Sequence, residues 1–465
     1  MMGTLNPYPA YKDSGVPWLG QVPEHWEVRR LGSVTQILNG ATPSSSRPEY
    51  WDGDIVWVTP DDLGKLKGRY IDNSSRRITQ EGYNACGTTL APAGSIVVST
   101  RAPIGHLGIL RVAACANQGC RLLVPQAATA SEYLYHMLVA ARPSLDVLGQ
   151  GSTFLELSRS KLGSFYIPLP PLPEQNAIVG FLDWADRRIR RVIRARQRRM
   201  KLLEEYKQAL IHQAVTGRID VRTSQPYPAY KDSGVEWLGK VPTHWEVLRL
   251  KYVARLRSGE SITSERIEET GDYPVYGGNG IRGFTSSFTH EGEFVLIGRQ
   301  GALCGNINYA NGRFWASEHA VVVHPLRKCL THWLGELLRA MNLNQYSIAA
   351  AQPGLAVERI QNLTIPFPPI EEQEQIDQYI NNQINAFDAA ISAARREIEL
   401  LREYRERLVS DAVTGKVDVR EVAARLPEEP PGEESEWMDT EEIAEAEMPD
   451  DDAAAVALSE EEVEI

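Results

Sequence analysis

Two stretches of this sequence are nearly identical, and they limit the folds open to the chain. Residues 8–34 and 227–253 agree at 21 of 27 positions, and both read YPAYKDSGVxWLGxVPxHWEVxRL up to the last three residues. A second pair, 167–222 and 365–420, opens with IPxPP and closes with DVR in each copy. The chain therefore consists of two repeats, and each repeat is long enough to form its own core.

The segments enclosed by these repeated stretches are different from each other. Residues 35–166 and 254–364 share little sequence and differ in length by 21 residues. Two repeats with the same flanking sequences and different inner segments predict one scaffold that holds two different recognition domains.

Composition is that of a water-soluble globular protein, with 43% hydrophobic and 24% charged residues among 465. No apolar run approaches the roughly 20 residues that a membrane-spanning helix needs. The first residues lack the basic and apolar regions of a secretory signal. We expect a cytoplasmic protein that does not bind membranes.

The net charge of −12 is unevenly distributed. From residue 421 onward eighteen acidic residues face the single Arg425, so the first 420 residues carry a net charge of +5. Such a charged segment with few large apolar residues is typical of a disordered tail. It could serve as a solubilising tail, or it could dock a basic partner.

A long helix is predicted near the end of each repeat. The proline-rich stretches after residues 166 and 364 exclude helix, and acidic residues then open helices from about Glu174 to Ala214 and from about Glu372 to Ala412. Each would be about 60 Å long and would end before a glycine, which suits a helix cap.

Apolar residues recur near heptad spacing on both predicted helices. One such stripe on each of two helices of equal length favours packing of the two helices on each other, although a partner's helix could cover part of it. The residues of the stripes are Ile178, Leu182, Ala185, Ile189, Val192, Leu203, Tyr206 and Leu210, and Ile376, Ile380, Phe387, Ala390, Ala394, Leu401, Tyr404 and Leu408.

Both variable segments are predicted to be mixed α/β domains with the same order of elements. In particular, 101–105 occupies the place of 299–305, and 116–118 that of 316–318. The predicted strands are 54–58, 95–99, 121–124, 293–297 and 320–323, and the predicted helices are near 131–142 and 331–343.

Motifs of catalysis and nucleotide binding are absent from the sequence. Residues 278–283 match GxGxxG, but the segment after them favours strand or loop, whereas a dinucleotide site needs the motif to open a helix. The chain has no P-loop, no HExxH, no GxSxG and no (D/N)PP(Y/F) motif of adenine methyltransferases. We interpret the chain as catalytically inactive.

The isolated cysteine, histidine and aspartate residues also have simple interpretations. Five cysteines without a CxxC pair favour buried thiols over a metal site or a disulfide framework. His319 and His324 are interpreted as structural or polar contacts. Asp52, Asp54, Asp61 and Asp62 are interpreted as surface acids, with a metal-nuclease site as the alternative.

Candidates for DNA recognition come from loops. Tyr276, Asn279 and Arg282 fall on a glycine-rich loop, where a thin backbone can approach a groove closely. Arg101 and Arg299 fall at matching places after a strand. Arginine pairs well with guanine edges and asparagine with adenine edges. Ordinary turn chemistry and surface salt bridges remain the alternative for each.

Three further candidates for DNA contact, Thr59, Gln118 and Ser152, belong to the first variable segment. Nine basic residues lie between 187 and 201 without an acid among them. They could attract phosphate, or they could form a solvated face or contact an acidic subunit or the chain's own tail.

Together these repeated motifs resemble the specificity subunit of type I restriction-modification systems. YPAYKDSGV…HWEV, IPLPPLPEQ with IPFPPIEEQ, the AVTGxxDVR endings and the Tyr50–Val58 stretch carry the resemblance, which covers about residues 1–420.

The resemblance implies an α/β fold of the α+β kind. It would have two globular target-recognition domains joined by two long antiparallel coiled-coil helices, with a pseudo-twofold internal repeat. The expected domains are 1–166 and 223–364 for recognition, 167–222 and 365–420 for the helices, and 421–465 for the acidic tail.

It also implies a function without catalysis. Each recognition domain would read one half of a split, asymmetric sequence in double-stranded DNA, and the helices would set the spacing and dock two methyltransferase subunits. Those partners would bind S-adenosylmethionine, and restriction subunits would use ATP and Mg²⁺. No cofactor or metal is expected on this chain.

Two alternatives remain open from the residues alone. One is a scaffold that assembles partner subunits without binding DNA. The other is a metal-dependent nuclease in the first variable segment that uses Asp54.

Overall fold

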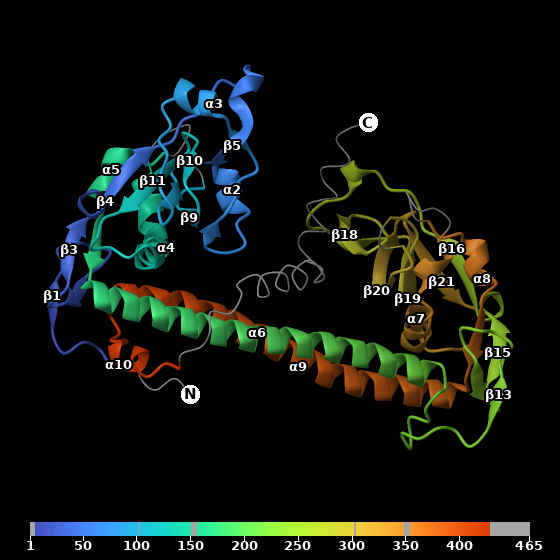
Figure 1. Ribbon diagram of the computed structural model, residues 1–465. Helices are drawn as coiled ribbons and strands as arrows, with labels where there is room; N and C mark the ends of the chain where they lie inside the picture. The colour runs from blue at the N-terminus through green and yellow to red at the C-terminus, as the bar shows by residue number, and fades with distance from the viewer. Residues whose placement is uncertain (1–4, 102, 150–155, 302–303, 348–353, 428–465) are drawn as a thin grey trace. The chain divides into compact units, whose positions relative to one another are not determined.

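The computed structural model describes residues 5–427 apart from 102, 150–155, 302–303 and 348–353. The chain forms two compact units. The first consists of residues up to Gln197 and from Arg396 onward, and the second runs from Arg198 to Arg395. Each unit contains one repeated block, one variable segment and parts of both long helices (Figure 1).

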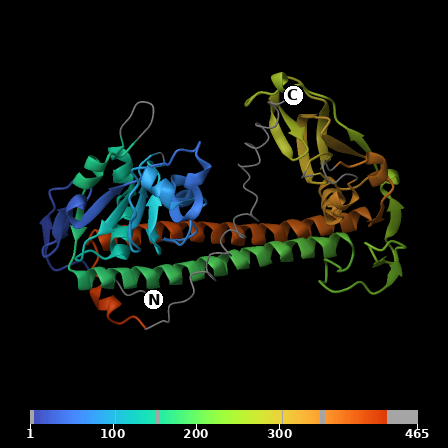
Figure 2. The same ribbon diagram turned by 45° about the horizontal axis from the view of Figure 1, so that its top comes forward.

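The long helices are α6 (Leu172–Val215) and α9 (Ile370–Val413), each of 44 residues. They begin two residues earlier and end one residue later than predicted. In each unit the helices lie side by side, as Figures 1 and 2 both show.

The two helices run antiparallel in each unit. In the first unit Arg196 forms a two-pronged ion pair with Glu397, at 2.7 and 2.9 Å, while Asp186, earlier on α6, pairs with Arg405, later on α9. A later residue of α6 thus contacts an earlier residue of α9, so the two helices run in opposite directions. The predicted antiparallel pair is confirmed.

The heptad prediction needs correction at Val192, at Tyr206 and at Tyr404, which is 43% exposed. Ile189 is buried, but Val192 is 41% exposed, and Ile193 (4% exposed) takes its place. Since an α-helix has 3.6 residues per turn, the buried stripe drifts off a strict heptad over a few turns. Tyr206 is also 60% exposed, although its ring edge contacts Phe387.

The variable segment of the first unit forms two sheets. A five-stranded sheet has the order β4-β11-β8-β9-β6, and a three-stranded sheet has the order β10-β5-β7. The strands are β4 (Thr35–Asn39), β5 (Trp51–Val58), β6 (Tyr70–Ile71), β7 (Arg77–Ile78), β8 (Ile96–Ser99), β9 (Leu107–Leu110), β10 (Ala114–Ala116) and β11 (Cys120–Pro125). The helices are α2 (Pro60–Gly64), α3 (Gln80–Ala85), α4 (Ser131–Leu148) and α5 (Arg159–Ser164), and α1 (Leu31–Val34) precedes the segment at the end of the repeated block.

The variable segment of the second unit forms one six-stranded sheet of order β16-β21-β19-β20-β17-β18. The strands are β16 (Ala254–Ser258), β17 (Tyr273–Gly277), β18 (Gly280–Thr285), β19 (His290–Gly298), β20 (Ile307–Ala316) and β21 (Ala320–Pro325). The helices are α7 (Thr331–Ala340) and α8 (Val357–Gln361). All strands and helices predicted in both segments are present.

The two variable domains differ in one long strand, which is β20 of the second unit. Strand β20 pairs antiparallel with β19 along its first part and parallel with β17 at its end. In the first unit β9 and β10 divide these pairings, since β9 pairs antiparallel with β8 and β10 pairs parallel with β5. The two domains therefore share one topology, with this strand broken in the first.

Short strand pairs join each repeated block to the segment that leads into a long helix. Strand β3 pairs with β12, and β15 pairs with β22, both antiparallel. The strands of the repeated blocks and their partners are β1 (Tyr11–Asp13), β2 (Gln21–Pro23), β3 (Glu27–Arg30), β12 (Tyr166–Leu169), β13 (Tyr230–Asp232), β14 (Lys240–Pro242), β15 (Glu246–Arg249) and β22 (Thr364–Phe367).

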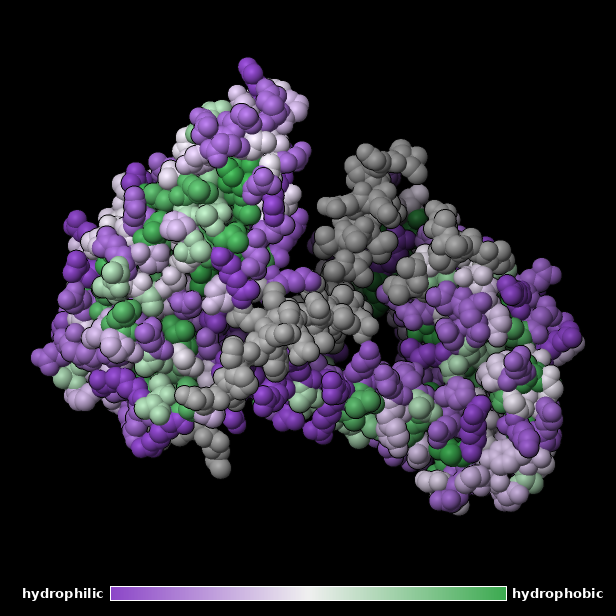
Figure 3. All heavy atoms as spheres, viewed as in Figure 1, coloured by the Kyte–Doolittle hydropathy of each residue, from purple (hydrophilic) through white to green (hydrophobic). Residues whose placement is uncertain are grey.

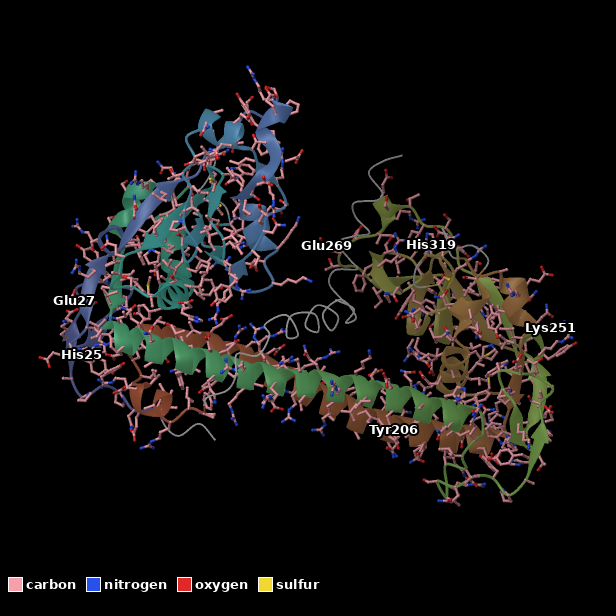
Figure 4. The ribbon with its side chains drawn as sticks, in the orientation of Figure 1. His25, Glu27, Tyr206, Lys251, Glu269 and His319 are labelled. Atoms are coloured by element: carbon pink, nitrogen blue, oxygen red, sulfur yellow. The ribbon has the colours of Figure 1, made fainter. Side chains whose placement is uncertain are left out.

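A buried carboxylate fixes the repeated block to the start of α6. The Glu174 carboxylate accepts hydrogen bonds from the Tyr8 hydroxyl (2.6 Å) and the Trp26 indole (3.0 Å), and His25 Nε2 lies 2.8 Å away. Burial, and then the bond to Glu174, raise the pKa of Tyr8. Figure 4 labels His25 beside this end of the helix.

The second unit repeats this arrangement. The Glu372 carboxylate accepts from the Tyr227 hydroxyl (3.1 Å) and the Trp245 indole (2.7 Å), with His244 Nε2 at 2.6 Å. Sequence reasoning assigned these glutamates to the positive end of a helix dipole and missed this role. The signal was available, because all four residue types recur in both repeats.

The neighbouring glutamine fastens each variable domain to its helix. Gln175 donates to the carbonyls of Ala128 and Pro170 and accepts from the Ala130 amide. Gln373 donates to the Pro368 carbonyl and accepts from the Leu330 amide. In both hinges the glutamate therefore binds the repeated block, and the glutamine that follows it binds the variable domain.

Residues beyond the predicted end of the second helix also belong to the first unit. Helix α10 (Arg420–Ala423) follows Asp418, whose carboxylate pairs with Arg420, and Val422 packs against the first core. The ordered chain therefore passes the expected boundary at 420. The disorder predicted for the tail concerns residues that, from 428 on, lie outside the described part.

No helix among the described residues is long and apolar enough to cross a membrane. The face drawn in Figure 3 is mostly hydrophilic, with hydrophobic residues in small groups.

Candidate nucleic-acid interface

A tight turn before β11 presents Gln118 at the surface of the first unit. The Cys120 amide donates to the Asn117 carbonyl (3.1 Å), and the Asn117 amide donates to the Val58 carbonyl at the end of β5 (2.9 Å). Gln118 is exposed at the tip of this turn. Its side chain is in hydrogen-bond contact with the Thr42 hydroxyl.

The second unit has the same turn before β21. The Ala320 amide donates to the Ser317 carbonyl (3.0 Å), and the Ser317 amide donates to the Tyr276 carbonyl (2.9 Å). Glu318 therefore occupies the place of Gln118. The predicted match of 116–118 with 316–318 is confirmed by these bonds.

The predicted match of Arg101 with Arg299 is out by one residue. The Thr100 amide donates to the Gly119 carbonyl (2.7 Å), whereas the Arg299 amide donates to the His319 carbonyl (2.8 Å). Thr100 is thus the equivalent of Arg299, and Arg101 that of Gln300. The connection to the next strand is one residue longer in the second unit, so sequence spacing alone could not give the register.

An ionic cluster surrounds Arg101 in the first unit. Arg101 lies 3.4 Å from the Glu156 carboxylate, and Arg121 lies 4.0 Å from the same group. Burial lowers the pKa of Arg121. Arg101 is half exposed, so it can contact a ligand while Glu156 holds its orientation. Ser152, another candidate in the first variable segment, lies outside the described residues.

A second cluster of polar side chains lies at the equivalent end of the second sheet. Arg299 donates to the Ser258 hydroxyl (3.2 Å). His319 Nδ1 lies 3.0 Å from the Gln300 side-chain oxygen, and His319 Nε2 lies 3.3 Å from Glu318. Figure 4 labels His319 at the end of the sheet away from the helices. Sequence reasoning predicted Arg299 here and missed Glu318 and Gln300.

The glycine-rich segment of the second unit is a hairpin and opens no helix. Tyr276 ends up in β17 and Arg282 in β18, so only Asn279 of these three candidates lies in the turn between the strands. The Asn279 side-chain oxygen accepts from Asn306, and the Tyr276 ring packs edge-on against Phe314. The Tyr276 ring therefore has a packing role, and the segment does not form a dinucleotide site, because that motif must begin a helix.

Thr59 has a structural role as the N-cap of α2. Its hydroxyl accepts from the Asp62 amide, and Asp62 in turn accepts from the Thr59 amide, which forms a capping box. Burial opposes ionisation of Asp62, but hydrogen bonds from Ser75 and Thr59 outweigh it and lower the pKa of Asp62. These hydrogen bonds show that Asp62 serves to cap α2.

Two equivalent glycines, Gly40 after β4 and Gly259 after β16, allow the backbone to pass close to each turn. A Cβ on Gly40 would collide with the Asn117 carbonyl, and a Cβ on Gly259 would collide with the Ala316 carbonyl. The residue after each glycine accepts an indole hydrogen bond, from Trp57 at 3.0 Å in one unit and from Trp315 at 3.1 Å in the other. The two turns are therefore supported in the same way.

The described residues contain no group of three or more His, Cys, Asp or Glu side chains that could hold a metal ion. The cysteines are free thiols, and burial raises the pKa of Cys115 to about 12. A thiol of that pKa stays protonated at neutral pH and is a poor nucleophile.

The basic run on α6 is partly used inside the first unit. Arg190 pairs with Asp186 and Arg196 with Glu397, while the Arg188 guanidinium stacks over the Trp184 ring. Part of this run therefore supports helix packing. Arg191 remains exposed at the surface.

Comparison with known proteins identifies the class to which this architecture belongs. Residues 23–196 and 242–400 match the family model for the type I restriction modification DNA specificity domain. The two matches cover both units, so the chain belongs to this family of specificity subunits.

Individual relatives agree with this assignment. The EcoprrI type I specificity subunit of Escherichia coli is 33% identical over 363 residues, which cover 74% of this chain and 84% of that protein. The MjaIX specificity subunit of Methanocaldococcus jannaschii is 27% identical over 428 residues, covering 87% of this chain and 96% of the relative.

Solved structures show the same fold at lower identity. A chain from a study of type I restriction-modification complex assembly superposes with a TM-score of 0.65 at 20% identity, covering 85% of this chain and 99% of that one. The HsdS subunit of Thermoanaerobacter tengcongensis superposes with a TM-score of 0.53 at 19% identity, covering 85% and 98%.

Proposed function

We propose that this chain is the non-catalytic subunit that gives a type I restriction-modification complex its DNA sequence specificity. Each variable domain reads one half of a bipartite target in double-stranded DNA. Because the two domains carry different side chains on matching turns, the two half-sites are different and the target is asymmetric.

The observation that carries this proposal is the pair of equivalent turns on equivalent supports. Gln118 and Glu318 occupy the same position in the hydrogen-bond pattern but differ in chemistry. Side chains that reach base edges provide direct readout of sequence, whereas backbone contacts position the protein. Arg101, Arg299 and Asn279 are the further candidates for DNA contact.

We further propose that the helix pair docks two methyltransferase subunits, one on each copy of the frame. Large apolar side chains remain exposed on these helices, namely Val192, Leu202, Tyr206, Leu400 and Tyr404. A two-helix pair buries only a narrow stripe, so this additional surface is suited to a partner protein. S-adenosylmethionine would bind to those partners, and ATP and Mg²⁺ to restriction subunits. Such a complex acts on chromosomal DNA in the cytoplasm.

The test is DNA selection with the chain reconstituted with its methyltransferase subunits. The complex is incubated with a random duplex library, and bound DNA is sequenced. We expect two short conserved blocks separated by a spacer of fixed length without sequence preference. Enrichment of no motif would contradict the proposal and favour a scaffold that assembles partners without reading DNA.

The spacing role is tested separately. If the helices set the distance between the half-sites, insertion of one or two helical turns into both helices should lengthen the spacer and leave both half-sites unchanged. An unchanged spacer would contradict this role.

A further inference from the structure

The turn that carries Glu318 is the most distinctive polar site of the second unit. Glu318 follows Ser317, whose hydroxyl is fully buried, and precedes His319, whose carbonyl accepts from the Arg299 amide. Backbone hydrogen bonds therefore fix the turn on both sides. A side chain at its tip is held in place without contributing to the hydrophobic core.

Only one oxygen of the Glu318 carboxylate has a partner within the described residues. Oε1 lies 3.3 Å from His319 Nε2, whereas Oε2 has no hydrogen bond within that part of the chain, although the protein shields it. An acceptor that is held out of water without a donor is unfavourable. The Glu318 side chain as a whole is 37% exposed, so a turn of its carboxylate would bring this oxygen to a donor supplied by a ligand.

The neighbouring side chains fix the direction of this carboxylate. His319 lies between Gln300 and Glu318, with one ring nitrogen 3.0 Å from Gln300 and the other 3.3 Å from Glu318. A side chain held in this way loses less freedom on binding, which favours discrimination between similar ligands. Gln300 and His319 are therefore positioning residues for Glu318.

The chemistry of a carboxylate limits the bases that it can read. It only accepts hydrogen bonds, and in the major groove cytosine presents its N4 amino group and adenine its N6 amino group. Guanine and thymine offer acceptors at the corresponding places, which a carboxylate repels. A glutamine has both a donor and an acceptor and matches the N6/N7 edge of adenine.

We propose that the residue at the tip of this turn selects one base in each half-site. Glu318 selects an amino-bearing base in the half-site of the second unit, and Gln118 selects adenine in the half-site of the first. This inference rests on the proposed function, because it names the residues through which each domain reads DNA.

The test uses the same reconstituted complex and DNA selection, with Glu318→Gln and Gln118→Glu as the main variants. For Glu318→Gln we expect cytosine to lose about tenfold relative to adenine at one position of one half-site, while the other half-site stays the same. For Gln118→Glu we expect the opposite half-site to change at one position, with cytosine accepted there.

Two further variants separate a reading role from a structural one. Glu318→Asp keeps the carboxylate and should keep the preference for an amino-bearing base, with weaker binding. Glu291→Gln is the matched control, because Glu291 is an exposed acid on β19 of the same domain that pairs with Arg313, and it should leave both half-sites unchanged.

The outcomes distinguish this inference from the proposed function. If wild-type complex selects a bipartite motif and both main variants select that same motif, the assignment of Glu318 and Gln118 is overturned and the proposed function stands. If wild-type complex selects no motif, both fail. If Glu318→Gln and Glu291→Gln change the motif equally, a general charge effect replaces the specific reading role.

Discussion

The two units use the same support for different purposes, and the difference between them is confined to a few places. Glu174 and Glu372 bind the same three residue types in the same arrangement. The turn tips, by contrast, carry Gln118 in one unit and Glu318 in the other. Replacement of the glutamate would leave buried donors without an acceptor, whereas a side chain at a turn tip can be replaced without that cost. The comparison teaches that specificity can change here without any change in the frame.

A second difference concerns the tryptophan whose indole hydrogen bond supports each turn. Trp57 lies on β5 and pairs in register with Cys115 on β10. In the second unit the tryptophan is Trp315 on β20, which pairs with Val275 on β17. Both indoles donate to the residue after a matched glycine. The bond has been kept while its donor moved to the neighbouring strand.

The largest expected effect comes from removal of a hinge carboxylate. Glu174→Ala should destabilise the first unit by about 3–5 kcal/mol, because it leaves the buried Tyr8 hydroxyl and Trp26 indole without an acceptor. Glu372→Ala should cost less, since the Glu372 side chain is 13% exposed against 7% for Glu174 and water can replace it more easily. Urea unfolding gives the totals, and hydrogen exchange locates the loss in one unit.

Glu371→Ala is the matched control for Glu372→Ala, because Glu371 is the exposed neighbour in the first turn of α9. It should change stability by less than about 0.5 kcal/mol. Equal losses for both variants would mean that the helix dipole, and not the hydrogen-bond network, accounts for these acids.

The moved tryptophan offers a sharper test of the comparison. Trp57→Val should destabilise the first unit by about 3 kcal/mol through a cavity and a lost hydrogen bond. Adding Cys115→Trp to this variant imports the arrangement of the second unit, in which valine faces tryptophan. We expect the double variant to recover at least half of the loss in thermal unfolding. A double variant less stable than Trp57→Val would show that the two pairs are not equivalent.

Much of this architecture could be predicted from the sequence, for identifiable reasons. Proline-rich hinges and long apolar stripes define α6 and α9 closely, because helix periodicity is a local property. The register between Thr100 and Arg299 could not be predicted, because the connection that follows differs in length by one residue and the arginines Arg101 and Arg299 fall at non-equivalent places in it. The recurrence of Tyr, His, Trp and Glu in both repeats marked these residues as a set, but their contact could not be located from sequence, because Tyr8 and Trp26 lie about 150 residues from Glu174.

A smaller effect should appear as a difference in pH dependence between the two domains. In the first unit Arg69 and His136 bind Asp183 of α6, and Arg69 does so with two bonds of 2.6 and 3.0 Å. Burial opposes ionisation of Asp183, but these partners outweigh it and lower its pKa to about 2. That contact is fully present above pH 4 and weakens only as the pH falls toward 2.

In the second unit a different contact joins α7 to α9, because His332 pairs with Asp377, about one helical turn nearer the hinge than the place of Asp183. The hydrogen bond to Asp377 raises the pKa of His332, so its stabilising effect is complete below pH 6.5 and is lost as the pH rises through the raised value. Hydrogen exchange at the start of α7 should therefore increase from pH 6 to 9, after correction for the intrinsic rate. His332→Gln should abolish this pH dependence, and a pH dependence that persists in that variant would rule out His332 as its source.

The central claim is that two different domains on one frame each read their own half-site. It is tested most directly by replacing residues 35–166 with the corresponding segment of a related specificity subunit and mapping the methylated sequence made by the reconstituted complex. The account predicts that one half-site changes while the other half-site and the spacer length stay the same. A change in both half-sites, or in neither, would contradict it.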